Sequence, residues 1–148
     1  MVKNKIMFIL SEIQQKNIVN AIHEAEELTS GEIKVHVEEH CPSANPIDRA
    51  AEVFRYLSLD KTALRNGVLF YLAYEDQKFA VIGDEGINRK VGQDFWNSTQ
   101  EILRENFRIG DFENGFIRAI EETGKKLQVY FPIQGVNENE LPNDISFG

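Results

Sequence analysis

The sequence has one cysteine and no long apolar run. Because Cys41 stands alone, an internal disulfide is excluded, and nothing indicates an oxidising compartment. No window approaches the roughly 18 consecutive apolar residues of a transmembrane helix. The apolar stretch 6–10 is too short for the core of a signal peptide, and Ser-Glu follows it in place of small cleavage-site residues. We therefore expect a cytoplasmic protein without membrane insertion.

Positive charge is also scarce. The chain has 16 Lys and Arg residues against 24 Asp and Glu residues, which gives a net charge of −8. Nucleic acids and anionic membranes bind basic surfaces that displace counterions, so this balance disfavours both as partners and leaves cations open. A hydrophobic content of 42% and a charged content of 27% are typical of soluble globular proteins, and 148 residues suit a single domain.

Two strongly apolar runs, separated by a polar turn, lie at the centre of the sequence. Residues 68–73 and 79–82 are rich in β-branched and aromatic side chains and are shorter than a helix, which indicates buried strands. The polar residues 74–78 between them predict a tight turn and hence an antiparallel hairpin. Hairpin pairing brings residues 65–67 close to residues 83–86, and we expect any functional site to lie there.

Apolar residues recur at helical spacing in four segments. The first begins at Ser11, which forms a capping-box pattern with Gln14, and ends near Gly31, a residue suited to a left-handed C-cap. The other three helical segments begin near Pro46, just after Gly86 and near Phe112.

Residues 33–38 alternate between apolar and polar side chains. This is the period of a strand with one solvent-exposed face, near the edge of a sheet. A helical segment separates it from the hairpin, and such a crossover joins parallel strands. The element order predicts the α/β class: a single-domain α/β/α sandwich with a small mixed sheet and a central antiparallel hairpin.

Composition divides the chain into three parts. Residues 1–10 form an N-terminal segment, and residues 11–131 form the α/β domain. Residues 132–148 contain turn formers and acidic residues but neither Lys nor Arg, which predicts a flexible acidic tail.

Two acidic residues lie between glycines where the hairpin meets the next helix. Asp84 and Glu85 offer the oxygen ligands that Ca²⁺ or Mg²⁺ requires, although no EF-hand or P-loop motif is present. A parallel first strand adds Glu32 and Asn66 at the same end of the sheet. These four residues are our candidate metal ligands, and Arg65 is the candidate phosphate contact. Alternatively, Asp84 only caps the helix and the glycines only form turns.

Residues 36–40 match the zinc-peptidase pattern H-x-x-E-H. The pattern binds zinc on a helix, where both histidines share one face, but the alternation here indicates a strand. On a strand, His36 and His40 lie roughly 13 Å apart, too far to share one ion. We therefore predict that they bind no zinc.

Four motifs, in order, resemble those of the TPM domain family, also called TPM phosphatase domains. They are residues 29–33, 65–69, 83–87 and 110–116, and the resemblance spans about residues 11–130. It implies a compact α/β/α sandwich, divalent-cation binding in some members and a weak acid phosphatase activity. The chain departs from the family in its longer glycine motif and in Asn88, which stands where a Glu is expected. Lacking the signal peptide and membrane segment of many members, it resembles a short soluble branch.

Three functions remain open. We favour a non-catalytic module that binds a divalent cation or takes part in assembly, because it needs the fewest precisely placed groups. The alternatives are a weak metal-dependent hydrolase of the acid-phosphatase type and a pure protein-interaction domain without metal. A protein partner is compatible with all three, but the sequence does not identify one.

Overall fold

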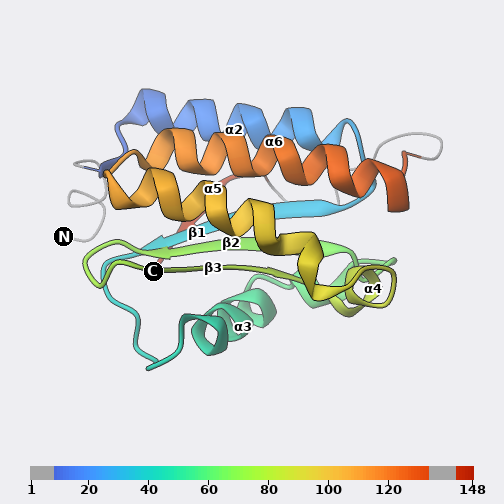
Figure 1. Cartoon of the computed structure of the whole chain (residues 1–148), viewed down its shortest axis with the longest axis horizontal. Helices are drawn as coiled ribbons and strands as arrows, with labels where there is room; N and C mark the ends of the chain where they lie inside the picture. The colour runs from blue at the N-terminus through green and yellow to red at the C-terminus, as the bar shows by residue number, and fades with distance from the viewer. Residues whose placement is uncertain (1–8, 134–142) are drawn as a thin grey trace.

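The fold is built on a four-stranded mixed sheet with the strand order β3-β2-β1-β4. The computed structural model describes residues 9–133 and 143–148, shown as a ribbon in Figure 1. The strands are β1 (Glu32–Glu38), β2 (Gly67–Ala73), β3 (Lys78–Gly83) and β4 (Ile145–Phe147). β1 runs parallel to β2 and β4, whereas β2 and β3 form an antiparallel hairpin. The α/β class, the parallel first strand and the central hairpin are confirmed.

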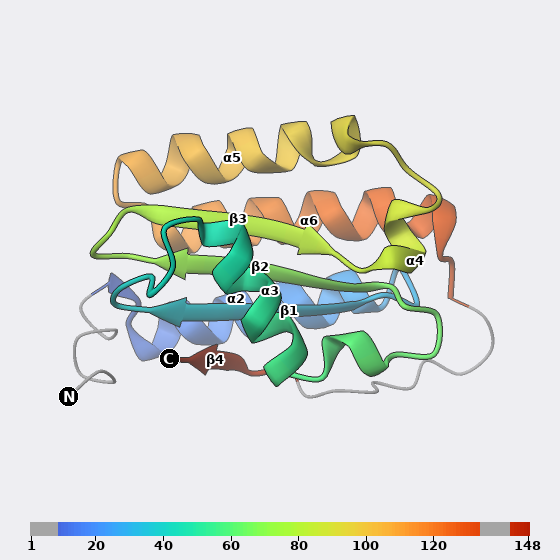
Figure 2. The ribbon, with the colours of Figure 1, turned by 90° about the horizontal axis from the view of Figure 1, so that it is seen from below.

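Helices cover both faces of the sheet (Figures 1 and 2). On one face lie α2 (Glu12–Glu26), α5 (Asn97–Arg108) and α6 (Phe112–Tyr130). On the other lies α3 (Pro46–Tyr56). The short elements are the 3₁₀ helix η1 (Leu59–Lys61), α4 (Glu85–Asn88) and the 3₁₀ helix η2 (Gln93–Trp96).

The alternation of side chains along β2 explains why its sequence is apolar throughout. Val68, Phe70 and Leu72 face the larger core under α2, α5 and α6. Leu69 and Tyr71 face a smaller core under α3. A strand with a core on each side needs apolar residues at every position, and the hairpin is therefore the part of the fold most visible in the sequence.

Helix starts follow the predicted capping chemistry. The Ser11 hydroxyl accepts a hydrogen bond from the Gln14 amide (3.2 Å), and the Gln14 side chain accepts one from the Ser11 amide (2.9 Å), which completes the capping box. α3 begins at Pro46, and the side chain of the preceding Asn45 caps it by accepting a hydrogen bond from Ile47 (2.9 Å).

The predicted solvent-exposed face of β1 was wrong. All seven residues of β1 are buried, because β2 and β4 flank it and its polar side chains find partners. The Glu38 carboxylate receives two hydrogen bonds of 2.8 Å from Arg49 and one from the Tyr71 hydroxyl. Buried charge is tolerated where it is paired in this way.

The predicted flexible tail was wrong for its last part. Residues 145–147 form β4, and Ile145 is buried opposite Val35 of β1. Residues 134–142 of the predicted tail, like residues 1–8, lie outside the described residues. Leu10, which the sequence assigned to the N-terminal segment, is fully buried in the larger core, so the packed domain includes it.

Two helix predictions need correction. The helix expected after Gly86 is broken into α4, η2 and α5, with Gly92 in an extended conformation before η2. α2 ends at Glu26, several residues before Gly31, which does not adopt the predicted left-handed conformation. The close approach of Leu127 and the Asn66 carbonyl oxygen explains the glycine instead, because a Cβ there would lie 3.1 and 3.2 Å from them.

Candidate functional site

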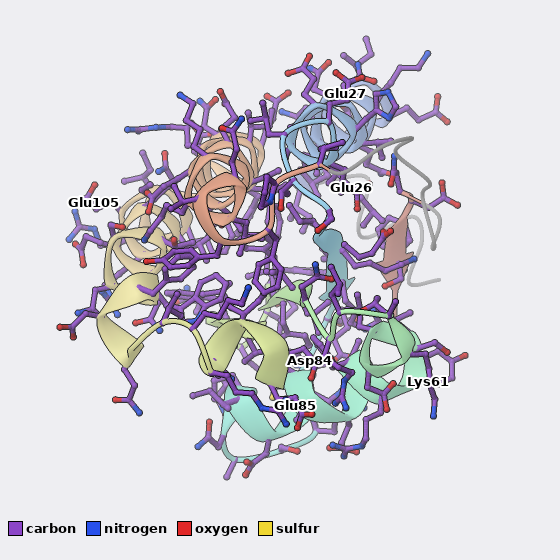
Figure 3. All side chains as sticks on the ribbon, turned by 90° about the vertical axis from the view of Figure 1, so that its right-hand side faces the viewer. Glu26, Glu27, Lys61, Asp84, Glu85 and Glu105 are labelled. Atoms are coloured by element: carbon purple, nitrogen blue, oxygen red, sulfur yellow. The ribbon has the colours of Figure 1, made fainter. Side chains whose placement is uncertain are left out.

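The open end of the hairpin holds a charge cluster centred on Arg65. Its guanidinium donates two hydrogen bonds to the Asp84 carboxylate, at 2.7 and 3.0 Å, and a third to Glu85 at 3.2 Å. Asp84 and Glu85 lie next to each other at this end of the molecule (Figure 3). Asp84 is buried, whereas the side chain of Arg65 is 41% exposed. The Asp84 hydrogen bonds raise the pKa of Arg65, so the guanidinium stays charged.

Close backbone contacts hold this cluster in place. The Asp84 amide donates to the Gly67 carbonyl oxygen (2.9 Å), which continues the hairpin ladder by one residue. The Gly86 amide donates to the Arg65 carbonyl oxygen (2.9 Å), and Arg65 has a left-handed backbone with φ of 51°. Asp84 also caps α4 by accepting a hydrogen bond from the Glu85 amide (2.7 Å). The expected cap is thus real, and it coexists with the ion pair.

A pocket of about 210 Å³ opens beside Arg65 and Asp84. Asp60 and Arg55, which the sequence analysis did not select, also line it. The Oδ1 atom of Asp60 is buried and has no hydrogen-bond partner among the described residues, and the Asp60 charge acts on Arg65. The signal for Asp60 was its position five residues before Arg65, on the same connection into β2.

Glu32 and Asn66 lie at the same end of the sheet but have other partners. Asn66 is buried and donates a side-chain hydrogen bond to the Ser30 hydroxyl (3.3 Å), which ties β2 to the connection before β1. Glu32 is buried, and its side chain interacts with Glu26. The predicted set therefore divides in two: Arg65, Asp84 and Glu85 converge, whereas Glu32 and Asn66 contribute to packing around the start of β1.

Glu26 is the most strongly perturbed acid. It is buried on the side of α2 that faces the sheet, and its carboxylate accepts a hydrogen bond from the Ile33 amide (2.9 Å) (Figure 3). Burial raises the pKa of Glu26 to about 9; the Glu32 carboxylate adds to the rise and the Ile33 hydrogen bond opposes it. Glu26 therefore carries a proton at neutral pH, which lets two carboxyl groups lie together in the interior.

The two histidines of the zinc-peptidase pattern are held in different surroundings. His36 is buried on β1, where its Nδ1 lies 2.8 Å from the Ser146 hydroxyl, and burial lowers its pKa. His40 is exposed, and its Nδ1 lies 2.8 Å from a carboxylate oxygen of Asp76 in the hairpin turn, an interaction that raises its pKa. The strand assignment, on which the zinc prediction depends, is confirmed for His36 but not for His40, which lies in the bend after β1 ends at Glu38.

Within residues 9–133 and 143–148, no three His, Cys, Asp or Glu side chains are grouped in a way that could hold a metal ion. At the hairpin's open end, the contacts of Asp84 explain this finding. Both carboxylate oxygens of Asp84 accept hydrogen bonds from Arg65, so the guanidinium occupies the space that an ion would need. The arrangement is that of a carboxylate cluster neutralised by an internal cation.

Comparisons with known proteins bear on the same residues. The TPM domain family profile matches residues 8–126. The chain belongs to the TPM domain family. This match includes the hairpin, Arg65 and the acidic junction, and it confirms the resemblance carried by the four sequence motifs. In the part of the chain that the structure describes, no helix is long and apolar enough to cross a bilayer.

Solved structures place the same fold in two bacteria. The NMR structure of the BA42 protein from the psychrophilic Bizionia argentinensis is 45% identical, with a TM-score of 0.88, over 94% of this chain and 95% of that one. The N-terminal domain of the cg2496 protein from Corynebacterium glutamicum is 12% identical, with a TM-score of 0.66, over 88% and 82% of the two chains. The second likeness concerns the fold alone. No curated protein matches the chain.

Proposed function

We propose that this TPM domain is a non-catalytic module that binds a divalent cation weakly at the open end of its hairpin. The ligands are the carboxylates of Asp84 and Glu85, and we add Asp60. The observation that carries the proposal is the pairing of Asp84 and Glu85 with one partly exposed guanidinium, on which the charge of Asp60 also acts. The buried, unpartnered Oδ1 of Asp60 supports it, because such an atom gains from a cation.

Arg65 controls the access of a cation to Asp84 and limits its affinity. A cation can reach Asp84 only when the guanidinium swings away, and the 41% exposure of the Arg65 side chain leaves room for that movement. Displacing a bidentate hydrogen-bonded partner costs free energy, so the affinity falls in the range of weak calcium modules, with dissociation constants of about 10⁻⁴ to 10⁻³ M. The irregular oxygen donors suit Ca²⁺ better than Mg²⁺, which demands near-ideal octahedral geometry.

Glu32 and Asn66 are not part of this proposed site. Their side chains are buried and engaged with Glu26 and Ser30, and recruiting them would break the packing around the start of β1. The cation site is therefore smaller than the sequence suggested.

The alternative function is a weak metal-dependent acid phosphatase. The presence of Arg55 and Arg65 in one pocket favours it, because guanidinium groups pair with phosphate oxygens. The pocket lining, however, offers no hydroxyl, thiol or imidazole nucleophile, and Arg65 already engages the Asp84 carboxylate. A protein-interaction domain without metal is the third candidate, in which the charge cluster only stabilises the junction.

A heteronuclear NMR titration with Ca²⁺ and then Mg²⁺ tests the proposal. Amide resonances of residues 65–67 and 83–87 should move along one saturable curve, and Asp84→Asn should weaken that curve while keeping a side chain able to cap α4. Asp94→Asn, which removes the same charge from η2, is the matched control and should leave the curve unchanged. Shifts scattered over all surface acids without saturation would exclude the site.

The same samples separate the module from the enzyme. Hydrolysis of p-nitrophenyl phosphate should stay at the buffer level with and without the cation. Turnover that needs the metal and is lost in Asp84→Asn would favour the phosphatase instead.

A further inference from the structure

β3 forms an open edge of the sheet, with β2 on one side and no strand among the described residues on the other. The ladder with β2 fixes which backbone groups face outward. Because Asp84 donates to Gly67, the hydrogen-bonded pairs at every second position involve Ile82, Ala80 and Lys78. The N–H and C=O groups of Phe79, Val81 and Gly83 therefore point away from β2.

These outward groups are mostly unused. The Gly83 carbonyl oxygen accepts a hydrogen bond from the Asn88 side chain (3.1 Å). The backbone groups of Phe79 and Val81 have no partner beyond the sheet among residues 9–133 and 143–148. Such a row of free donors and acceptors is a template for one more strand.

Two cavities follow this edge along its length. The first, of about 350 Å³, runs beside residues 77–81, between the start of α3 and the side chains of Gln100 and Arg104 on α5. The second, of about 520 Å³, runs beside residues 81–83, η2 and the preceding loop. Together they form a groove, which we call the β3 groove, from the hairpin turn to the start of α4.

The position of α5 limits what can enter the β3 groove. α5 lies beyond β3 and overhangs the edge of the sheet, while α3 stands on the other face (Figure 2). The edge of a second copy would bring its own overhanging helix against these walls. The walls therefore favour a single peptide strand over a second copy of this chain.

The lining residues indicate the chemistry of that peptide. Lys78 and Arg104 lie at the end near the hairpin turn, and neither cavity is lined by Asp or Glu. Glu101, which pairs with Arg104 at 2.6 Å, is not among the lining residues. At the other end, Val91 and Trp96 provide an apolar surface. In a protein with an excess of acids, this is a locally basic and apolar groove, complementary to a segment with both carboxylate and apolar side chains.

We propose that the β3 groove binds an extended acidic peptide as an added β-strand. Main-chain hydrogen bonds to Phe79 and Val81 supply the affinity, as in other β-strand additions. An acidic side chain on the α3 face of the added strand pairs with Lys78, one on the α5 face pairs with Arg104, and an apolar side chain farther along the strand lies against Trp96. The β3 groove shares Ile82 and Gly83 with the pocket beside Arg65, but none of the three proposed cation ligands lines the groove, so peptide binding does not depend on a divalent cation.

The test titrates the whole chain with the capped hexapeptide Glu-Glu-Glu-Val-Val-Val, which presents carboxylates to both faces at one end and apolar side chains at the other, and follows binding by NMR in excess chelator. Amide shifts should concentrate on residues 77–83, and the variant of the peptide with Lys in place of Glu should bind at least about fivefold more weakly. Arg104→Gln should weaken binding severalfold, whereas Arg118→Gln, an exposed arginine on α6, should not. Equal binding of both peptides would overturn the charge assignment.

Backbone N-methylation distinguishes strand addition from nonspecific contact. In an added strand, alternate peptide amides face β3. Of two peptides methylated at alternating sets of amides, one should lose at least about tenfold in affinity, and the other should keep its affinity. If both lose it equally, or neither does, the strand-addition proposal is wrong.

A proline variant and a dimer assay complete the design. Val81→Pro removes an outward N–H that β2 does not use, but it also alters a side chain buried in the larger core, so it should weaken the fold without unfolding it and should abolish binding. If this variant unfolds, the two N-methylated peptides alone decide whether the peptide binds as an added strand. A concentration-dependent dimer that Val81→Pro abolishes would overturn the proposal in favour of pairing between two copies.

Discussion

At the scale of single residues, Gly86 is the position where the candidate site allows no side chain. A Cβ there would lie 2.5 Å from the Arg65 carbonyl oxygen and closer still to that of Leu64. The contact exists because the Gly86 amide donates to the Arg65 carbonyl, which locks α4 against the connection into β2. The glycine thus holds Arg65 and Asp84 in register.

Gly86→Ala should reduce the free energy of unfolding by roughly 1–3 kcal/mol, because two backbone segments must separate to admit the methyl group. Gly92→Ala is the matched control: no atom lies within 4 Å of its Cβ, and its backbone is extended. The control should be neutral or stabilising by up to about 1 kcal/mol. Denaturant unfolding of both variants checks the difference, and equal midpoints would contradict the close approach.

Glu26 gives the stability of this protein a pH dependence of defined sign. Its pKa rises from 4.5 to about 9 on folding, so between these values the native state holds a proton that the unfolded chain releases. The free energy of unfolding should therefore fall as pH increases through this window, by up to about 1.4 kcal/mol per pH unit. Below pH 4.5 the contribution of Glu26 is constant.

Glu26→Gln should remove most of that slope and exceed the wild type in stability near pH 8, since the amide can still accept the Ile33 hydrogen bond. Glu27→Gln, an exposed neighbour, should leave the slope unchanged. Urea unfolding of the wild type and the two variants at several pH values between 5 and 8 measures the slope of the unfolding free energy against pH. An unaltered slope in Glu26→Gln would mean that Glu26 is ionised in the fold.

At the scale of elements, local signals predicted more than distant ones. The hairpin was predicted because its apolar strands and polar turn are continuous in the sequence. The buried face of β1 was missed because the partners that neutralise its Glu38 are distant in the sequence. Arg49 lies 11 residues away and Tyr71 lies 33 residues away. β4 was missed because three residues between turn formers carry almost no periodicity, and its partner β1 lies about 110 residues earlier.

The docking of β4 has a measurable consequence. Ile145 is buried against the larger core, so Ile145→Ala should cost roughly 2 kcal/mol or more of unfolding free energy. Phe147, which is 39% exposed, serves as control, and Phe147→Ala should cost less. Thermal or urea unfolding compares the two. If Ile145→Ala unfolds at the wild-type midpoint, the tail is loose, as the sequence alone suggested.

In the candidate site, too, the sequence predicted the position of the backbone but not the contacts of the side chains. Sequence reasoning placed Arg65, Asp84 and Glu85 at one end of the hairpin, which strand pairing alone requires. It could not predict that Arg65 turns onto Asp84 and fills the space intended for an ion, because that depends on side-chain rotamers. It also added Glu32 and Asn66, which share the end of the sheet but have other partners.

At the scale of the whole molecule, the two proposed surfaces meet at the end of β3, where both are lined by Ile82 and Gly83. The Arg65 cluster closes the end of the sheet where β2 begins and β3 ends, whereas the β3 groove follows the open edge of β3. The net charge of −8 attracts cations everywhere, so weak binding alone says little about the cluster. What distinguishes a site from a charged surface is the specific competition between a cation and Arg65.

That competition is measured most directly by the Ca²⁺ affinity of Arg65→Gln, followed by NMR on residues 83–87. Removing the guanidinium frees both oxygens of Asp84, so the dissociation constant should fall by about fivefold or more, the equivalent of about 1 kcal/mol of lost repulsion. Arg118→Gln, which changes the net charge equally on α6, should leave the affinity near the wild-type value. Affinity that is unchanged or weaker in Arg65→Gln would contradict a cation site at the hairpin's open end.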